Sequence, residues 1–188
     1  MRRIFYLAML FLLLGFTGCS SASYQRIADG FVVNIKESEL TPAHKIKLQV
    51  VNDKIIRITA TADKNFSSEK SLMIIPELSF SDKFEVVDDG SFIVLSTDSI
   101  DVKVSKENGG IVFLDKNGNT ILAENRGGGK SFLPIEVEGT KGYTIKQIFE
   151  SPDDEAFYGL GQHQADDFNY KGKNESLYQY NTKVSVPF

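Results

Sequence analysis

Beyond residue 30 the hydrophobic and polar positions alternate with a period of two, which is typical of strands that have one buried and one solvated face. Residues 45–50 read Lys-Ile-Lys-Leu-Gln-Val, and residues 54–60 repeat the pattern. Asn52-Asp53 lies between them and predicts a hairpin turn. Similar segments predict further strands at residues 92–96, 100–104, 111–114, 120–122, 132–137 and 143–149.

Short polar dipeptides rich in glycine separate these segments. Asp89-Gly90, Asn108-Gly109-Gly110 and Asn117-Gly118 supply the positive φ angles that tight hairpins require. Ten or more short strands, spaced by about 8 to 12 residues, predict an antiparallel β-sandwich or barrel. No stretch of about 12 residues after residue 20 has helical periodicity. The sequence therefore predicts an all-β fold.

The first residues follow a different pattern. Arg2-Arg3 precede an apolar run over residues 4–16, which is shorter than the roughly 20 residues that a transmembrane helix needs. Residues 1–18 are therefore expected to be a signal helix. Thr17-Gly18-Cys19 resembles the bacterial lipoprotein cleavage box, although Phe16 stands where that box usually has Leu.

The box implies cleavage before Cys19 and a lipid on its sulfur, which would anchor the chain to a membrane of the cell envelope. The resemblance then implies a position at the outer membrane or the periplasmic face of a Gram-negative bacterium. Residues 19–29 are then a tether, and residues 30–188 the sandwich. The alternative is a signal peptide without lipidation, in which the cysteine is incidental.

Composition narrows the class of protein. The chain has 188 residues, which suits one domain after removal of the leader but not a barrel enzyme of about 250 residues. The 21 basic and 25 acidic residues form no basic block, which argues against nucleic acid as a partner. The single cysteine excludes an internal disulfide framework and a Cys-rich zinc site.

Three local motifs have weak chemical interpretations. Residues 126–130 (Arg-Gly-Gly-Gly-Lys) favour a surface loop over a phosphate cradle, because no helix is predicted after them. Residues 159–161 (Gly-Leu-Gly) are interpreted as glycines that allow close backbone packing at the end of a strand, and not as a dinucleotide-binding site. His163 with Asp166 and Asp167 favours a solvated loop over a metal site, so we expect no metal and no cofactor.

Three stretches together resemble a known family. They are residues 44–59, residues 95–104 with 110–122, and residues 156–162, the last of which reads Ala-Phe-Tyr-Gly-Leu-Gly-Gln. In this order they resemble the galactose mutarotase-like N-terminal β-sandwich of glycoside hydrolase family 31, the α-glucosidases and α-xylosidases. The family signature is FYGLGE, and Gln162 stands where the family often has Glu.

The resemblance implies retaining hydrolysis of α-glycosidic bonds in oligosaccharides by two aspartates on a (β/α)₈ barrel, with the carboxyls about 5 Å apart. In the family that barrel follows the region matched here. Residues 183–188 alternate as a strand without a turn or polar tail, so we expect the chain to end within the domain. We expect the polypeptide to lack the catalytic residues and to be inactive alone.

The resemblance also implies one substrate contact in this domain. In the family a loop after the FYGLG strand reaches the active site, and Asn181 and Thr182 match the position that contacts sugar hydroxyls. An amide both donates and accepts hydrogen bonds, which suits a vicinal diol. The alternative for both residues is ordinary hydrogen bonding at a strand edge. Phe168 or Tyr180 would offer an aromatic face to a pyranose.

Three functions remain open at this point. The first is the N-terminal part of a family 31 α-glycosidase, either an α-xylosidase or an α-glucosidase. The second is a stand-alone, non-catalytic carbohydrate-binding lipoprotein at the cell surface, because a β-sandwich fold does not fix function. The third is a structural domain that binds nothing by itself.

Overall fold

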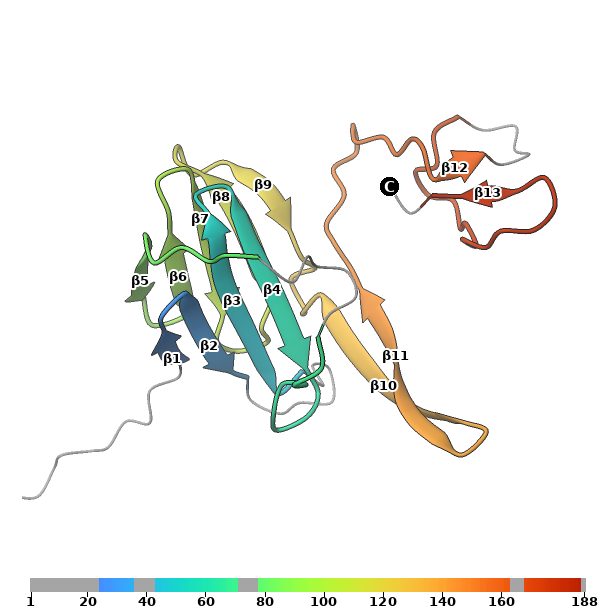
Figure 1. Ribbon diagram of the computed structural model, residues 1–188. Coiled ribbons are helices and arrows are strands. Elements are labelled where there is room, and N and C mark those ends of the chain that lie inside the picture. The colour runs from blue at the N-terminus through green and yellow to red at the C-terminus, as the bar shows by residue number, and fades with distance from the viewer. Residues whose placement is uncertain (1–23, 36–42, 71–77, 163–167, 187–188) are drawn as a thin grey trace, which may run out of the picture. The chain divides into compact units, whose positions relative to one another are not determined.

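The structure is a computed structural model that describes residues 24–35, 43–70, 78–162 and 168–186 (Figure 1). Thirteen strands and no helix occur in these ranges, and every pairing between named strands is antiparallel. In the described ranges no helix is long and apolar enough to cross a membrane. The chain divides into two units, residues 1–149 and 150–188. Each unit is described separately below.

The first sheet of the first unit has four strands in sequence order. Its third strand pairs with the second and the fourth, and Leu48 on it lies opposite both Phe31 and Ile58. The turn predicted at Asn52-Asp53 lies one residue further on, at Asp53-Lys54. The Asn52 side-chain oxygen accepts a hydrogen bond from the backbone N–H of Lys54 at 2.9 Å. The strands are β1 (Tyr24–Ile27), β2 (Gly30–Asn34), β3 (Lys45–Asn52) and β4 (Ile55–Thr61).

The second sheet has five strands, also in sequence order. Its last turn is held by Asp115, whose Oδ1 accepts hydrogen bonds from the backbone N–H groups of Asn117 and Asn119, both at 2.8 Å. Bonds from Asn119 in particular hold the pKa of Asp115 below its usual value. The strands are β5 (Glu85–Asp88), β6 (Phe92–Ser96), β7 (Ile100–Ser105), β8 (Ile111–Asp115) and β9 (Thr120–Ala123).

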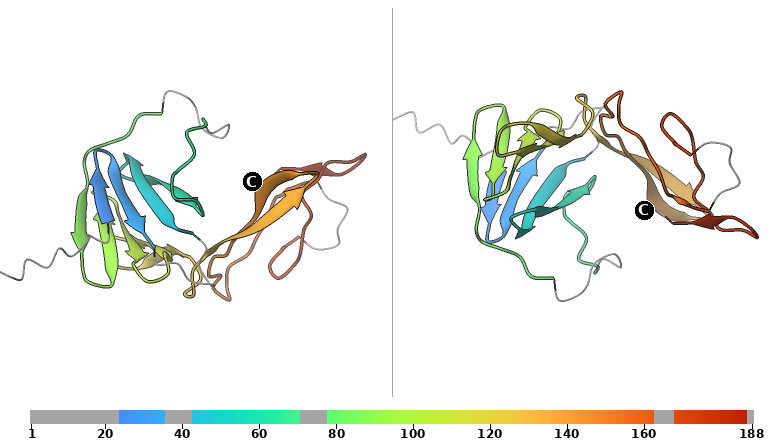
Figure 2. Two further views of the ribbon diagram at one scale, coloured as in Figure 1. Left: turned by 90° about the horizontal axis from the view of Figure 1, so that it is seen from below. Right: turned by 90° about the horizontal axis from the view of Figure 1, so that it is seen from above.

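The two sheets stack as two layers around one core, as Figure 2 shows. Ten large side chains of the described residues are at most 1% exposed there, and burial of each such side chain contributes roughly 1.5–3 kcal/mol. In each strand they stand mainly two residues apart, so the predicted alternation and the sandwich are confirmed. The ten are Phe31, Val33, Ile46, Leu48 and Val50 from the first sheet, and Ile93, Leu95, Val102, Val104 and Ile111 from the second.

Two turns tie the sheets together at one end. The Thr97 hydroxyl donates a hydrogen bond to the backbone carbonyl of Asp53 at 2.6 Å, and the Ser99 hydroxyl donates to the Asp53 carboxylate at 2.5 Å. The β3–β4 turn and the β6–β7 turn therefore hold each other in place.

A long hairpin follows the sandwich in the first unit. It consists of β10 (Lys130–Val137) and β11 (Thr140–Gln147), joined by Glu138-Gly139 with φ angles of 49° and 80°. Most of its side chains are exposed. Its base is fixed by backbone bonds from Ile148 N–H to the Gly129 carbonyl (2.7 Å) and from Asn125 N–H to the Ile148 carbonyl (3.2 Å).

The second unit, Glu150–Phe188, contains little regular structure. Its two short strands, β12 (Gly161–Gln162) and β13 (Val184–Ser185), pair antiparallel. None of its described residues is buried. Backbone bonds and turns therefore hold this unit together, with very little hydrophobic burial.

The strands predicted between residues 45 and 149 are all present, with ends that shift by a few residues. Of the strand expected over 183–188, Val184–Ser185 is a strand and residues 187–188 lie outside the described residues. Strands β1, β2 and β5 lie outside the ranges predicted from alternation, and β12 lies in the segment that resembles FYGLGE. β1 falls inside the range 19–29 that the sequence assigns to a tether, and its Tyr24 packs edge-on against Phe31 with ring centroids 6.0 Å apart. The predicted signal helix at 1–18 and Cys19 lie outside the described residues.

Candidate functional site

Asn181 and Thr182 form the two central residues of a tight turn just before β13. Backbone bonds between Tyr180 and Lys183 close the turn, from Lys183 N–H at 2.9 Å and from Tyr180 N–H at 3.3 Å. Asn181 has a φ of 50°, a left-handed conformation that Asn adopts more readily than most residues. The backbone thus gives a conformational reason for an asparagine at this position.

The side chains of this turn point to no partner in the described part of the chain. Both residues are exposed, and neither side chain makes a hydrogen bond to the described residues. The amide of Asn181 and the hydroxyl of Thr182 therefore keep their donors and acceptors available to a ligand.

The residues around the turn fold back on themselves. The Lys183 ammonium lies 3.7 Å from a Glu175 carboxylate oxygen and 4.8 Å from the centre of the Tyr178 ring. The Ser185 hydroxyl donates a hydrogen bond to the Tyr178 carbonyl at 2.9 Å. These contacts restrict the segment that carries Asn181, although a partly exposed ion pair contributes little to stability by itself.

The glycines at 159 and 161 have a backbone role. Gly159, Leu160 and Gly161 have φ angles of 99°, 64° and 105°, and a Cβ on Gly161 would lie 2.2 Å from the Val184 carbonyl oxygen. The N–H of Val186 also bonds to the Leu160 carbonyl at 3.0 Å. Close approach of backbone to β13 explains Gly161, and it brings this segment beside the one that carries Asn181.

Aromatic side chains are unusually exposed in this unit. Phe168 is 83% exposed and Tyr180 is 76% exposed. The ring of Phe168 lies 5.1 Å from that of Tyr158, at an interplanar angle of 43°. Asn169 holds the adjacent chain, because its side-chain oxygen accepts bonds from Phe157 N–H and Lys171 N–H, both at 3.0 Å.

The first unit contains a buried ion pair that the sequence did not predict. The Lys130 ammonium donates to both carboxylate oxygens of Glu124, and these residues are only 8% and 7% exposed. A Glu124 oxygen also accepts the N–H of Ile111 at 3.2 Å. Desolvation lowers the pKa of Lys130, and the negative charge of Glu124 opposes that change.

The prediction of a plain surface loop at 126–130 is therefore wrong at its C-terminal end. A Cβ on Gly129 would lie 2.7 Å from the Glu124 Cβ and 2.8 Å from the Ile148 carbonyl oxygen. The glycine permits close packing that brings Lys130 to Glu124. Strand β10 begins at Lys130, so no helix follows these glycines and a phosphate cradle has no support.

An apolar groove of about 420 Å³ adjoins this ion pair. Side chains of β4, β8, β9 and the hairpin line it. Its apolar walls include Ile58, Phe113, Leu122, Phe132 and Ile145.

The remaining candidate considered from the sequence was a metal site. Among the described residues no group of three or more His, Cys, Asp or Glu side chains is placed to hold a metal ion. His163, Asp166 and Asp167 lie outside the described residues.

Comparison with known proteins agrees with this fold. Residues 45–185 match the model of the glycosyl hydrolase 31 N-terminal galactose mutarotase-like domain. An α-xylosidase of Saccharolobus solfataricus is 26% identical over 155 residues, which cover 76% of this chain and 20% of that enzyme.

Two solved structures are also similar. A family 31 α-xylosidase from Xanthomonas citri is 37% identical, with a TM-score of 0.74, and the match covers 87% of this chain and 17% of that protein. A family 31 α-xylosidase from a soil metagenome, solved with xylose, shares the fold at 23% identity and a TM-score of 0.67, over 88% of this chain and 26% of that one.

The chain thus spans about a fifth of the length of these relatives. The family match extends over three quarters of its residues and covers parts of both units described above. The chain belongs to glycoside hydrolase family 31 and carries the N-terminal galactose mutarotase-like domain of that family.

Proposed function

We propose that the chain is the N-terminal domain of a retaining α-glycosidase that hydrolyses α-xylosides or α-glucosides. The match to α-xylosidases carries this proposal, above all the 37% identity to the Xanthomonas citri enzyme. The chain covers 17% of that protein, so the two catalytic carboxylates belong to a barrel outside these 188 residues. Within that scheme the sandwich is a rigid support.

The turn at Asn181-Thr182 supplies sugar contacts in this proposal. Both side chains are exposed and have unused hydrogen-bonding groups, and the exposed ring of Tyr180 is adjacent in sequence. Hydrogen bonds to two hydroxyls would orient the sugar against the catalytic carboxylates, and orientation contributes directly to rate.

A lipid at Cys19 completes the proposal. Diacylglycerol at this cysteine would hold the enzyme on a membrane of the cell envelope, because two or more acyl chains anchor stably where one does not. Cells that express the protein should incorporate labelled palmitate into it, and the Cys19→Ser variant should incorporate none. Equal labelling of the variant would exclude this anchor.

The activity is tested with the full-length protein encoded by the gene. We expect it to release p-nitrophenol from p-nitrophenyl α-xyloside or α-glucoside, while the 188-residue chain alone releases none. Absence of turnover of both substrates by the full-length protein would contradict the proposed function. Turnover by the 188-residue chain would contradict the placement of the catalytic carboxylates.

The role of Asn181 is tested by a variant that separates the turn from the amide. Asn181→Gly keeps a residue that adopts φ near 50° without strain but removes the side chain. Loss of one or two hydrogen bonds of about 1 kcal/mol each should lower kcat/KM about tenfold, with an unchanged unfolding midpoint. An unchanged kcat/KM would show that Asn181 serves only the turn.

A further inference from the structure

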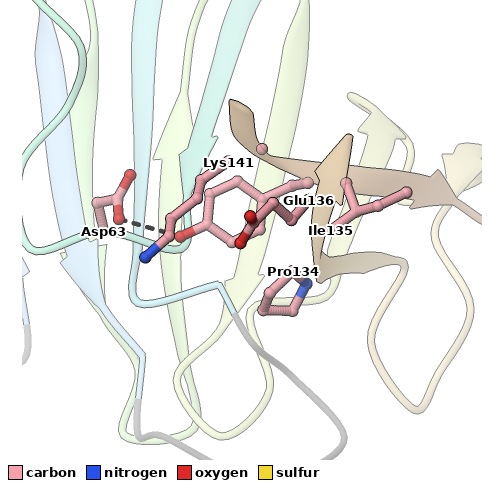
Figure 3. Close-up of a pocket in the computed structure, with 7 residues that line it drawn as sticks. Asp63, Pro134, Ile135, Glu136 and Lys141 are labelled. Carbon is pink, nitrogen blue, oxygen red and sulfur yellow. Dashed lines mark hydrogen bonds between the residues drawn. The ribbon is translucent and has the colours of Figure 1, made fainter. Parts of the chain in front are cut away.

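A separate pocket lies in the first unit, where the end of β4 meets the hairpin. Its volume is about 450 Å³, within the range of pockets that hold small molecules. Figure 3 shows the side chains of Asp63, Glu136 and Lys141 gathered in this pocket, with Pro134 beside them. None of these residues belongs to the Asn181-Thr182 turn.

The aromatic wall of the pocket is the ring of Tyr143, which is held at two points. Its hydroxyl donates a hydrogen bond to Asp63 Oδ1 at 3.1 Å, drawn as a dashed line in Figure 3. The ring also meets Phe132 edge to face, with centroids 6.1 Å apart and an interplanar angle of 88°. The side chain keeps 40% of its surface exposed. A fixed and open ring binds a ligand at a low cost in conformational entropy.

Pro134 extends this apolar wall. It pairs directly with Tyr143 across the hairpin, so both side chains stand on the same face of the two strands. Glu136 pairs with Lys141 two residues further along, which places that charged pair on the same face. This face of the hairpin therefore has an apolar part, formed by Tyr143 and Pro134, next to a charged part, formed by Glu136 and Lys141.

The charged groups of the pocket have hydrogen-bonding capacity to spare. The Asp63 backbone is held by a bond from its N–H to the Thr61 hydroxyl at 3.1 Å, and Tyr143 occupies only one of its carboxylate oxygens. Within the described residues Glu136 and Lys141 form no ion pair, either with each other or with Asp63. Two carboxylates and one ammonium thus surround the exposed ring.

We propose that this pocket binds one pyranose unit of a neutral glycan. The C–H face of the sugar would lie on Tyr143 and Pro134, while its hydroxyls would donate to Asp63 and Glu136 and accept from Lys141. The two carboxylates outnumber the single ammonium, which disfavours an anionic ligand. The choice of a glycan as ligand rests on the proposed function, whereas the pocket itself does not.

Such a site would retain a polymeric substrate on the enzyme. A single shallow sugar site binds weakly, but a glycan held at this pocket would have its other units at a raised effective concentration for a second contact on the same protein. The expected consequence is tighter binding of polysaccharide, with no change in the hydrolysis of a small substrate.

The test uses the full-length protein in native gels that contain xyloglucan, whose retardation measures binding. Tyr143→Ala should weaken the association constant at least tenfold, and the pair Asp63→Asn with Glu136→Gln should weaken it several-fold while the ring remains. Thr144→Ala is the matched control, because Thr144 is exposed on the opposite face of the same strand. All variants should hydrolyse p-nitrophenyl α-xyloside as the parent does.

The outcomes separate the two proposals. Retardation of Tyr143→Ala equal to that of the parent, or no retardation of the parent at all, would overturn the proposal that this pocket binds a sugar. If Tyr143→Ala fails to fold, as judged by its thermal unfolding, the double variant Asp63→Asn with Glu136→Gln replaces it. Retardation of that double variant equal to that of the parent would then overturn the proposed sugar site. Loss of retardation in a protein that hydrolyses no α-glycoside would overturn the proposed activity and leave the pocket standing.

Discussion

The sandwich and the segment Glu150–Phe188 are stabilised in different ways. Among the described residues, every large side chain that is less than 2% exposed lies between Phe31 and Ile111. In Glu150–Phe188 none of the described residues is buried, and order comes from backbone bonds, turns and glycines at positive φ. The sandwich has a hydrophobic core of its own, whereas the second segment has none among its described residues.

This difference in burial agrees with the position of the candidate sugar-binding residues. Segments with few buried contacts open at low free energy, and binding residues are often drawn from such segments on a rigid scaffold. Asn181, Thr182 and the exposed rings of Phe168 and Tyr180 all lie in the second segment. The hairpin is intermediate, because its base is held by a buried ion pair and its tip is exposed.

The largest effect should come from the sandwich core. Leu95 is fully buried, so Leu95→Ala should lower the free energy of unfolding by about 3–4 kcal/mol through lost burial and the cavity left behind. Leu177→Ala, at a side chain that is 47% exposed, should change it by less than about 0.5 kcal/mol. Urea unfolding followed by circular dichroism measures both. Similar losses in the two variants would remove the contrast between the regions.

A slightly smaller effect is expected at the base of the hairpin. Lys130→Met leaves the buried Glu124 carboxylate without its partner, which should cost about 3 kcal/mol of unfolding free energy. The double variant with Glu124→Leu should recover most of that loss, because a buried pair can be replaced by apolar side chains at little cost.

An exposed ion pair is the control for this experiment. Lys116 lies 2.8 Å from Asp101, and both side chains are partly exposed. Lys116→Met should therefore cost at most about 1 kcal/mol in the same urea titration. A loss for Lys130→Met no larger than for Lys116→Met would show that burial of the first pair does not matter.

The sandwich was predictable because its strands carry a period of two. In β3 the buried positions Ile46, Leu48 and Val50 follow the pattern directly, and Asn52-Asp53 marks the turn to within one residue. β5 is a strand of only four residues with no fully buried position. A pattern that arises from burial predicts such a strand poorly.

The site was less predictable because its contacts join distant parts of the chain. Glu124 and Lys130 flank a run of glycines, and nothing local shows that folding buries them together. The match to the family singled out Asn181, but the positive φ that explains an asparagine there appears only in the folded turn. The pocket around Tyr143 needs Asp63, which is 80 residues away in sequence.

The smallest effect on overall stability should come from Gly161→Ala, although its local effect is large. The new Cβ would lie 2.2 Å from the Val184 carbonyl oxygen at a φ of 105°, so β12 and β13 should no longer pair. Because this segment buries so little, the free energy of unfolding from urea titration should change by less than about 0.5 kcal/mol. Amide chemical shifts should change in Glu150–Phe188 and stay constant in the sandwich.

Gly172→Ala separates the clash from backbone strain. Gly172 also has a positive φ, 73°, but a Cβ there would meet nothing within 4 Å. This variant should carry only the strain of a left-handed alanine, about 1–2 kcal/mol felt within its own turn, and should keep the β12–β13 amide shifts. If Gly161→Ala also weakens the sandwich by several kcal/mol, the second segment is coupled to the core, and the two regions are not independent in stability.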